Sequence, residues 1–305
     1  MSGKILITGG SGLIGMRLSE MLIDQGYEVA HLSRNPDKVS KYKTFRWDVK
    51  QGYIDENAIT YADYIVHLAG ASLSSEKWTE ERKKEIIDSR VKSANLLYKC
   101  LSDSEHHVKG FVSVSGINVY GDSGDRLISE ENTTGDDYLA EVCKAWEASA
   151  WQMHDLNLRT VILRLGIVLS TKGGALPQLA RPVKLMAGAT LGSGKQYMSW
   201  IHIDDACRLF IRAIEDPQFH GVYNAVAPHP VTNKAFTQAL AEVIKRPLVL
   251  PKVPAFALNL VMGEMSEVVL SSLRVSANKV LQTGFTFEYN YLGEALASFY
   301  KEEKD

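Results

Sequence analysis

The sequence predicts an open α/β fold, a doubly wound parallel sheet followed by a smaller, mainly helical C-terminal lobe. Apolar strand-like runs alternate with amphipathic helical stretches over about the first 170 residues, as in repeated βαβ units. A glycine cluster lies between the first strand and the first helix, and after Leu169 the rhythm gives way to glycine-rich and proline-punctuated segments. No internal repeat interrupts this pattern.

Each expected element follows from its hydrophobic period, which is about 2 for a strand and 3.6 for a helix. The expected strands are Lys4–Thr8, Glu28–Ser33, Lys43–Trp47, Tyr64–Ala69, Gly110–Ser115, Thr160–Leu165 and Trp200–Ile203. The expected helices are Met16–Gln25, Glu80–Leu101, Tyr138–Leu156 and Ala206–Glu215, the last of them capped by Asp204 and Asp205.

Composition narrows the class of ligand. The 305 residues carry a formal net charge of −2 with no basic stripe, so we expect neither a nucleic-acid nor a membrane partner but a small-molecule substrate. Three widely spaced cysteines without a CxxC pair predict a reducing compartment and no metal site. With no leader pattern and no apolar stretch long enough to span a bilayer, a cytoplasmic location is expected.

The glycine cluster has the context of a phosphate-binding turn. Gly10, Gly12 and Gly15 satisfy a GxGxxG spacing after a strand and before a helix. Glycine lets the backbone turn sharply and approach a pyrophosphate closely, while the helix N-terminus supplies free N–H groups and positive potential. The pattern therefore predicts a Rossmann-type dinucleotide site, contacted by Thr8, Gly9, Gly10, Ser11, Gly12, Leu13, Ile14 and Gly15.

The end of the second strand predicts which dinucleotide is bound. An NAD site would place Asp or Glu here for the ribose hydroxyls, whereas this chain has Ser33 and Arg34. A guanidinium suits a 2′-phosphate, which favours NADP(H), although Arg34 could also be a solvated surface charge. We therefore expect an NADP-binding domain over residues 1–170, with 196–226 returning to it, and a substrate lobe formed by 171–195 and 227–305.

Motifs spread along nearly the whole chain resemble one known superfamily. Thr8–Gly15 and His67-Leu68-Ala69-Gly70 are similar to segments of the extended short-chain dehydrogenase/reductases. Trp146-Glu147, Leu163–Gly166 and Ser199–Asp205 point more specifically to the atypical branch named NAD-dependent epimerase or nucleoside-diphosphate-sugar epimerase family, with its C-terminal lobe.

The resemblance implies roles for further residues. It places Asp48 on the adenine amino group, Leu68, Ala69 and Gly70 beside the adenosine, and the strand end at 113–115 against the nicotinamide. Asp48 could instead cap the turn that follows it, and the Ala-Gly pair could serve packing alone. Many relatives pair through helices of the dinucleotide domain, so a homodimer is an open expectation.

The proton relay of the superfamily, a Tyr-x-x-x-Lys pair, is missing. Aligned on Glu147, Leu139 stands at the tyrosine position and Cys143 at the lysine position. The remaining catalytic candidates are Ser115 as a polariser of a carbonyl, Tyr120 or Tyr138 as an acid, Cys143 as a thiol donor and Arg90 as a cation for cofactor or acidic substrate. Each could equally be structural.

The substrate side also departs from the relatives that process nucleotide-sugars. Their Asn and Arg correspond to Ile167 and Met198, so a nucleotide-sugar substrate is not expected. Gln196, Trp200 and His202 are the candidates for lining a different pocket. Two functions fit: an NADP(H)-dependent redox or redox-assisted isomerisation enzyme, or a cofactor-binding sensor or scaffold, a possibility that the cell-division label of some branch members also raises.

Overall fold

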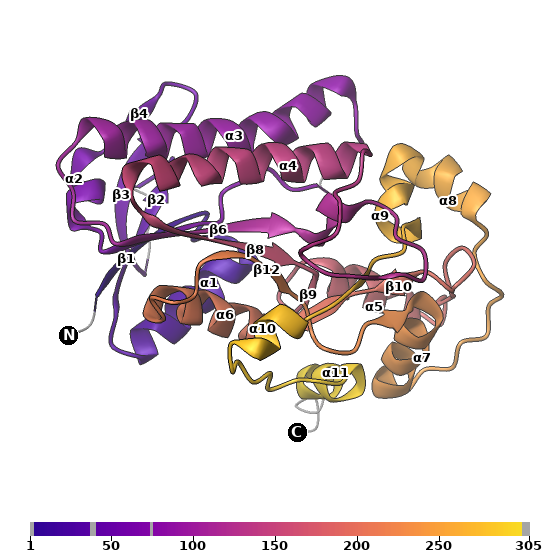
Figure 1. The fold of residues 1–305 in the computed structure, drawn as a ribbon. Helices are drawn as coiled ribbons and strands as arrows, with labels where there is room; N and C mark the ends of the chain where they lie inside the picture. The colour runs from indigo at the N-terminus through magenta and orange to yellow at the C-terminus, as the bar shows by residue number, and fades with distance from the viewer. Residues whose placement is uncertain (1–2, 37–40, 74–75, 301–305) are drawn as a thin grey trace.

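The computed structural model describes residues 3–36, 41–73 and 76–300 and is built around one large sheet (Figure 1). Its eight strands lie in the order β12-β8-β6-β5-β1-β2-β3-β4, and every neighbouring pair is parallel except β3 and β4. The chain winds outward from β1 to β2 and β3, then crosses back to β5 on the other side of β1. The expected doubly wound parallel sheet is confirmed.

The strands of the sheet are β1 (Lys4–Thr8), β2 (Glu28–Ser33), β3 (Lys43–Asp48), β4 (Tyr53–Ile54), β5 (Tyr64–His67), β6 (Gly110–Gly116), β8 (Arg159–Leu165) and β12 (Gly221–Ala225). The α-helices are α1 (Leu13–Asp24), α2 (Glu56–Tyr61), α3 (Glu80–Asp103), α4 (Tyr138–Trp151), α5 (Ala175–Lys184), α6 (Ile203–Glu215), α7 (Asn233–Ile244), α8 (Ala255–Met262), α9 (Glu267–Leu270), α10 (Asn278–Gln282) and α11 (Leu292–Tyr300). Short 3-10 turns are η1 (Ile117–Tyr120), η2 (Gln152–Leu156) and η3 (Gly263–Ser266).

Two helical layers cover the sheet because its strands are apolar on both faces. On β1, Ile5 and Ile7 join the cluster under α1 and α6, whereas Leu6 faces the opposite way and packs with Leu97 of α3. Figure 1 shows α3 and α4 along one side of the sheet and α1 and α6 along the other. The carboxyl ends of the parallel strands are thereby left for a ligand.

Three separate two-stranded ladders lie outside the large sheet and join distant segments of the chain. They pair β10 (Tyr197–Met198) with β13 (Val231–Thr232), β11 (Trp200–His202) with β9 (Ile167–Leu169), and β14 (Arg274–Val275) with β7 (Leu127–Ile128). A separate core cluster joins α5, α7 and α11, with Leu176, Phe236 and Leu296 at its centre. The mainly helical C-terminal lobe is confirmed.

The start of α6 differs from the expectation. The helix begins at Ile203, and the imidazole Nδ1 of His202 caps it by accepting the amide of Asp204. The prediction that Asp204 and Asp205 cap this helix is therefore wrong, because both lie inside its first turn. Asp204 instead accepts Arg17 of α1 at 2.6 Å, and Asp205 holds a distant segment of chain.

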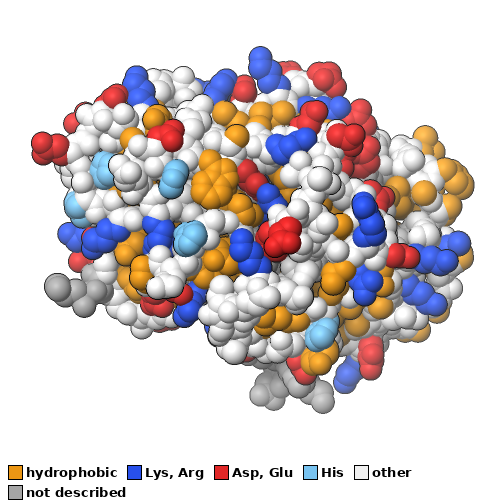
Figure 2. All heavy atoms as spheres, in the orientation of Figure 1, with side chains coloured by type: hydrophobic (Ala, Val, Ile, Leu, Met, Phe, Trp, Pro, Cys, Tyr) orange, Lys and Arg blue, Asp and Glu red, His pale blue; other side chains and the backbone are white. Residues whose placement is uncertain are grey.

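The surface mixes charges of both signs, and Figure 2 shows apolar side chains gathered at the edge of the molecule occupied by α8. Helix α8 buries none of its residues, and Phe256, Leu260 and Val261 are more than 70% exposed. In the part of the chain that the structure describes, no helix has the length and apolarity to cross a bilayer.

Asp205 generates a prediction for stability. Its fully buried carboxylate accepts the backbone amides of Glu288 and Tyr289 and pairs with Arg208, which fixes the approach to α11. Asp205→Asn replaces one acceptor by a donor, so we expect the free energy of unfolding to fall by about 1–3 kcal/mol. Urea denaturation would measure it. The exposed Glu242→Gln is the control, and an equal loss in both variants would contradict the assigned role.

Candidate functional site

The turn between β1 and α1 is shaped by contacts that only glycine permits. Gly9 has a φ of +66°, and a Cβ there would lie 2.9 Å from the Leu68 carbonyl. A Cβ at Gly10 would meet the ring of His31, and one at Gly15 would come within 2.6 Å of the Gly9 oxygen. The loop is thus pressed against β2, the β5 loop and its own helix.

Gly12 differs from these three because no side chain and only one backbone atom lie within 4 Å of where its Cβ would stand. Its φ of −77° suits any residue, and the nearest atom to an added Cβ is the Gly9 oxygen at 3.1 Å. Gly12 caps α1 without a side-chain hydrogen bond, so the helix itself offers no acceptor to the first-turn amides of Leu13, Ile14 and Gly15. This uncapped cradle fits a phosphate group.

A buried hydrogen-bonded chain joins the glycine loop to the loop after β5. Thr8 Oγ1 accepts the amides of Leu68 and Ala69 at 3.1 Å each, which leaves its proton for His67 Nδ1 at 2.8 Å. Ser93 Oγ donates to the Arg90 carbonyl and therefore accepts from His67 Nε2 at 3.2 Å. Burial lowers the pKa of His67 to about 4, in keeping with the neutral ring that this chain requires.

The residues predicted to contact the adenosine half are at least partly accessible where β2 and β3 end. Arg34 is exposed just past β2, and within the described residues no hydrogen bond or ion pair engages its side chain. Ser33 Oγ accepts the amide of Asn35. Asp48 lies half-buried at the end of β3. One of its carboxylate oxygens accepts the amides of Lys50 and Gln51, so this oxygen caps the turn, as the alternative to adenine binding predicted.

Ser115, a predicted polariser, is the last residue but one of β6 and is buried. Its hydroxyl donates to Glu147 Oε1 at 2.8 Å. The Glu147 carboxylate in turn makes a two-pronged ion pair with Arg164, with Nε and NH2 each 2.8 Å from a carboxylate oxygen. Burial alone would lower the pKa of Arg164, but the hydrogen bonds and charge of Glu147 raise it overall.

Tyr120, a predicted acid, belongs to the same buried network. Its hydroxyl accepts from Arg164 NH1 at 2.8 Å and donates to Asn224 Oδ1 at 2.7 Å. Burial raises the pKa of Tyr120, although Arg164 opposes this shift. With both functions of its hydroxyl in use, Tyr120 has no proton to offer a ligand.

The place of the missing relay is filled by small and apolar groups. Cys143 Sγ lies 3.4 Å from where a Cβ of Gly116 would stand, at the end of β6. Burial raises the pKa of Cys143 to about 11, so it is a neutral thiol at pH 7. Leu139 is buried one turn before it. Tyr138 is only half-buried, and its hydroxyl donates to the Lys83 carbonyl at 3.0 Å.

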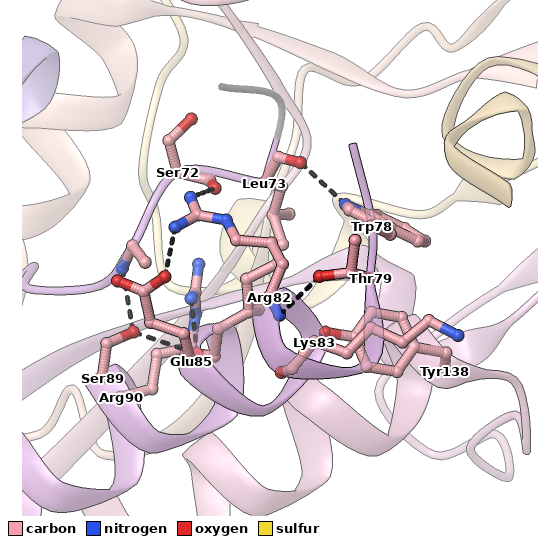
Figure 3. Close-up of polar contacts among 12 residues, drawn as sticks. Ser72, Leu73, Trp78, Thr79, Arg82, Lys83, Glu85, Ser89, Arg90 and Tyr138 are labelled. Atoms are coloured by element: carbon pink, nitrogen blue, oxygen red, sulfur yellow. Dashed lines mark hydrogen bonds and ion pairs between the residues drawn. The ribbon is translucent and has the colours of Figure 1, made fainter. Parts of the chain in front are cut away.

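Arg90, predicted to meet cofactor or substrate, lies on α3 beneath the β5 loop. Its guanidinium carbon is 3.1 Å from the position that a Cβ of Gly70 would take, and it stacks over the Trp146 ring at 4.6 Å. Figure 3 shows Arg82 and Arg90 on this part of α3, with the carboxylate of Glu85 turned towards Arg82.

The side chains of the three substrate-side candidates, Gln196, Trp200 and His202, are buried and bonded within the protein. Trp200 is fully buried and donates to the His229 carbonyl. Gln196 donates to the carbonyls of Leu191 and Val269. His202 caps α6 and stacks between Tyr289 and Phe299 at 3.9 and 4.5 Å. These contacts build the C-terminal lobe and argue against direct contact of the three side chains with substrate.

Sequence reasoning missed the pairing of Glu147 with Arg164 and the part played by Asn224. One signal was available: Glu147 lies on the apolar face of α4 with Cys143, and Arg164 interrupts the apolar run from Val161 to Leu165. Opposite charges on two buried faces imply a pair. Among the described residues, no group of His, Cys, Asp or Glu has the arrangement to hold a metal ion.

Comparison with known proteins finds two family matches along the chain. Residues 5–226 match the model of the NAD dependent epimerase/dehydratase family, and residues 253–299 match a domain of unknown function, DUF1731. The epimerase family protein YfhF of Bacillus subtilis is 34% identical, covering 99% of both chains. A chloroplastic epimerase family protein SDR39U1 homologue of Arabidopsis thaliana is 35% identical, covering 96% of this chain and 85% of the relative.

Solved structures agree over the full length. The human epimerase family protein SDR39U1, crystallised with NADPH, is 30% identical with a TM-score of 0.87, and the match covers 98% of this chain and 99% of that one. A nucleoside-diphosphate sugar epimerase from Corynebacterium glutamicum is 32% identical with a TM-score of 0.79, covering 98% of this chain and 58% of the other.

The Glu147–Arg164 pair predicts a large stability effect. Glu147→Gln leaves the Arg164 guanidinium buried beside an uncharged amide, so we expect a loss of about 3–5 kcal/mol in the free energy of unfolding. Ser115→Ala removes one hydrogen bond to the carboxylate but keeps the ion pair, so it should cost less, about 1.5–3 kcal/mol. Denaturant titration of both variants gives the comparison, and a smaller loss for Glu147→Gln than for Ser115→Ala would contradict the network.

His67 predicts a pH dependence. Its pKa is about 4 in the folded protein and about 6.5 when unfolded, so the unfolded chain binds the extra proton first as pH falls. Stability should therefore decline from about pH 6.5 towards pH 4. The slope attributable to His67 approaches about 1.4 kcal/mol per pH unit. Comparing the unfolding free energy of wild type and His67→Gln across this range isolates it, and parallel curves would refute the assignment.

Proposed function

Since the chain belongs to the NAD dependent epimerase/dehydratase family, we propose that it binds NADP(H) and carries out a redox or redox-assisted isomerisation step on a small carbonyl or alcohol. The observation that carries this proposal is the glycine cradle, where Gly12 leaves the first-turn amides of α1 uncapped beside a space without a side chain. The bound nicotinamide would supply the capacity to accept or donate a hydride.

Arg34 supports the phosphorylated form of the dinucleotide. Its exposed guanidinium follows β2, where a carboxylate would repel a 2′-phosphate. The cofactor seen in the human relative is NADPH. Residues of this chain would hold the cofactor at three points: the amides of Leu13–Gly15 for the pyrophosphate, Arg34 for the 2′-phosphate, and the free oxygen of Asp48 for the adenine amino group.

The buried network supports Tyr138 over Tyr120 as the group that exchanges a proton with substrate. Tyr120 is buried with its hydroxyl held between Arg164 and Asn224. The Tyr138 phenol is half-buried against Trp78 and donates only to the Lys83 carbonyl, which a substrate oxygen could replace. Ser115 keeps its proton on Glu147, so its lone pairs are what it offers to a hydroxyl group of the substrate.

The filled relay position favours a second candidate function. With Leu139 and Cys143 in place of the Tyr and Lys of the superfamily, the chain would instead act as a cofactor-dependent sensor or scaffold. This function predicts cofactor binding without turnover, and a protein partner whose affinity changes with the cofactor.

Absorbance of NADPH at 340 nm against a broad panel of small carbonyl compounds separates the two. Turnover that falls in Tyr138→Phe but persists in Tyr53→Phe supports the enzyme function. Tyr53 is the control because it is an exposed tyrosine in a distant part of the sequence. Tight NADPH binding with no turnover on any compound supports the sensor. Absence of NADPH binding refutes both.

Arg34 gives a direct prediction for cofactor choice. In Arg34→Glu the carboxylate would repel the 2′-phosphate, so NADPH should bind at least about tenfold more weakly while NADH binding is kept or improved. Fluorescence titration measures both dissociation constants. Gly12→Ala should weaken both dinucleotides because its methyl group enters the cradle. If Arg34→Glu weakens the binding of NADPH and NADH equally, the Arg34 guanidinium does not bind the 2′-phosphate.

A further inference from the structure

Arg90 is a buried cation without a counter-charge. The residue is 6% exposed, its NH1 donates to the Ile86 carbonyl at 2.9 Å, and its Nε has no hydrogen-bond partner in the described part of the chain. No carboxylate there forms an ion pair with it, and its main contact is the face of Trp146. A buried charge without a partner is costly, which calls for a reason to keep it.

The groups around Arg90 do not neutralise it. Glu85 pairs with Arg82 at 2.6 Å, and Glu147 is committed to Arg164. Burial raises the pKa values of Cys143 and Tyr138, so both side chains are uncharged at pH 7.

Although burial lowers the pKa of Arg90, a guanidinium stays protonated in proteins. One unmatched positive charge therefore remains between the β5 loop and Trp146.

Topology places that charge at the nicotinamide half of the cofactor. The pyrophosphate cradle follows β1, and Arg34 and Asp48 mark the adenosine half over β2 and β3. The other half of a dinucleotide then lies across the switch point, over β5 and β6. Arg90 lies under Gly70, in the loop after β5 that the resemblance places beside the adenosine. It also reaches towards the nicotinamide half, because Cys143, which interacts with its charge, packs on Gly116 at the end of β6.

We propose that Arg90 makes this site selective for the reduced cofactor, so that NADPH binds more tightly than NADP⁺. This inference rests on the proposed function of NADP(H) binding. The two forms differ by one positive charge on the nicotinamide ring, while their phosphates and adenosine are the same. A fixed cation beside the ring repels only the oxidised form, and its attraction for the shared phosphates cancels from the ratio of affinities.

The experiment measures the dissociation constants of NADPH and NADP⁺ by calorimetry on wild type and variants at one salt concentration. In wild type we expect NADPH to bind at least about tenfold more tightly. Arg90→Gln and Arg90→Met should bring the two constants to within about threefold, chiefly by improving NADP⁺. Arg90→Lys keeps the charge and should keep most of the preference. Lys84→Gln, an exposed charge on the same helix, is the control.

Other outcomes overturn the inference in distinguishable ways. If Arg90→Gln weakens both forms equally, the guanidinium serves the pyrophosphate and not the ring, and NADP(H) binding itself stands. Equal affinity of the two forms for wild type also rejects the inference, even if no Arg90 variant folds. If wild type binds neither form, it is the proposed function that fails.

Discussion

The ion pair between Glu147 and Arg164 is the constraint on which the arrangement of the candidate site depends. Both side chains are buried below the carboxyl edge of the sheet, where an unpaired charge would be costly. Their fork geometry fixes α4 against β8, draws the Ser115 hydroxyl inward and, through Tyr120, reaches Asn224 on β12. Ser115 and Tyr120, whose positions suggest catalysis, are thereby held in place by other side chains of the protein.

Much of the fold was predictable because it depends on local periodicity. Strands β1, β2, β3, β5, β6 and β8 and helices α1, α3 and α4 were located to within a few residues, since a parallel sheet covered on both faces leaves long apolar runs. The edge strands β4 and β12 were not predicted. The glycine turn was equally readable. The predicted start of helix α6 was three residues too late. Its cap is His202, an uncommon capping residue, while the two aspartates beside it resemble the usual capping signal.

The candidate site was less predictable because its partners are distant in the chain. Ser115 meets Glu147, and Tyr120 meets Asn224 over a hundred residues later. Spacing within one segment cannot reveal whether a hydroxyl faces a ligand or another element. Trp200 and His202 show the same limit. Alternation along a strand indicates that a side chain points inward, but it does not show whether that side chain lines a pocket or packs against other residues.

The pairing of β14 with β7 shows that the boundary between the two family matches is not a boundary in the architecture. Val275 and Val280 pack into the same core as Ile117 and Val119, and Ser272 binds the loop at Ser123 and Gly124. A fragment that stopped near residue 226 would strip one wall from that core and expose a bare strand edge. Exchange of C-terminal regions between relatives would thus have to carry matching loops with it, which ties the evolution of the two halves together.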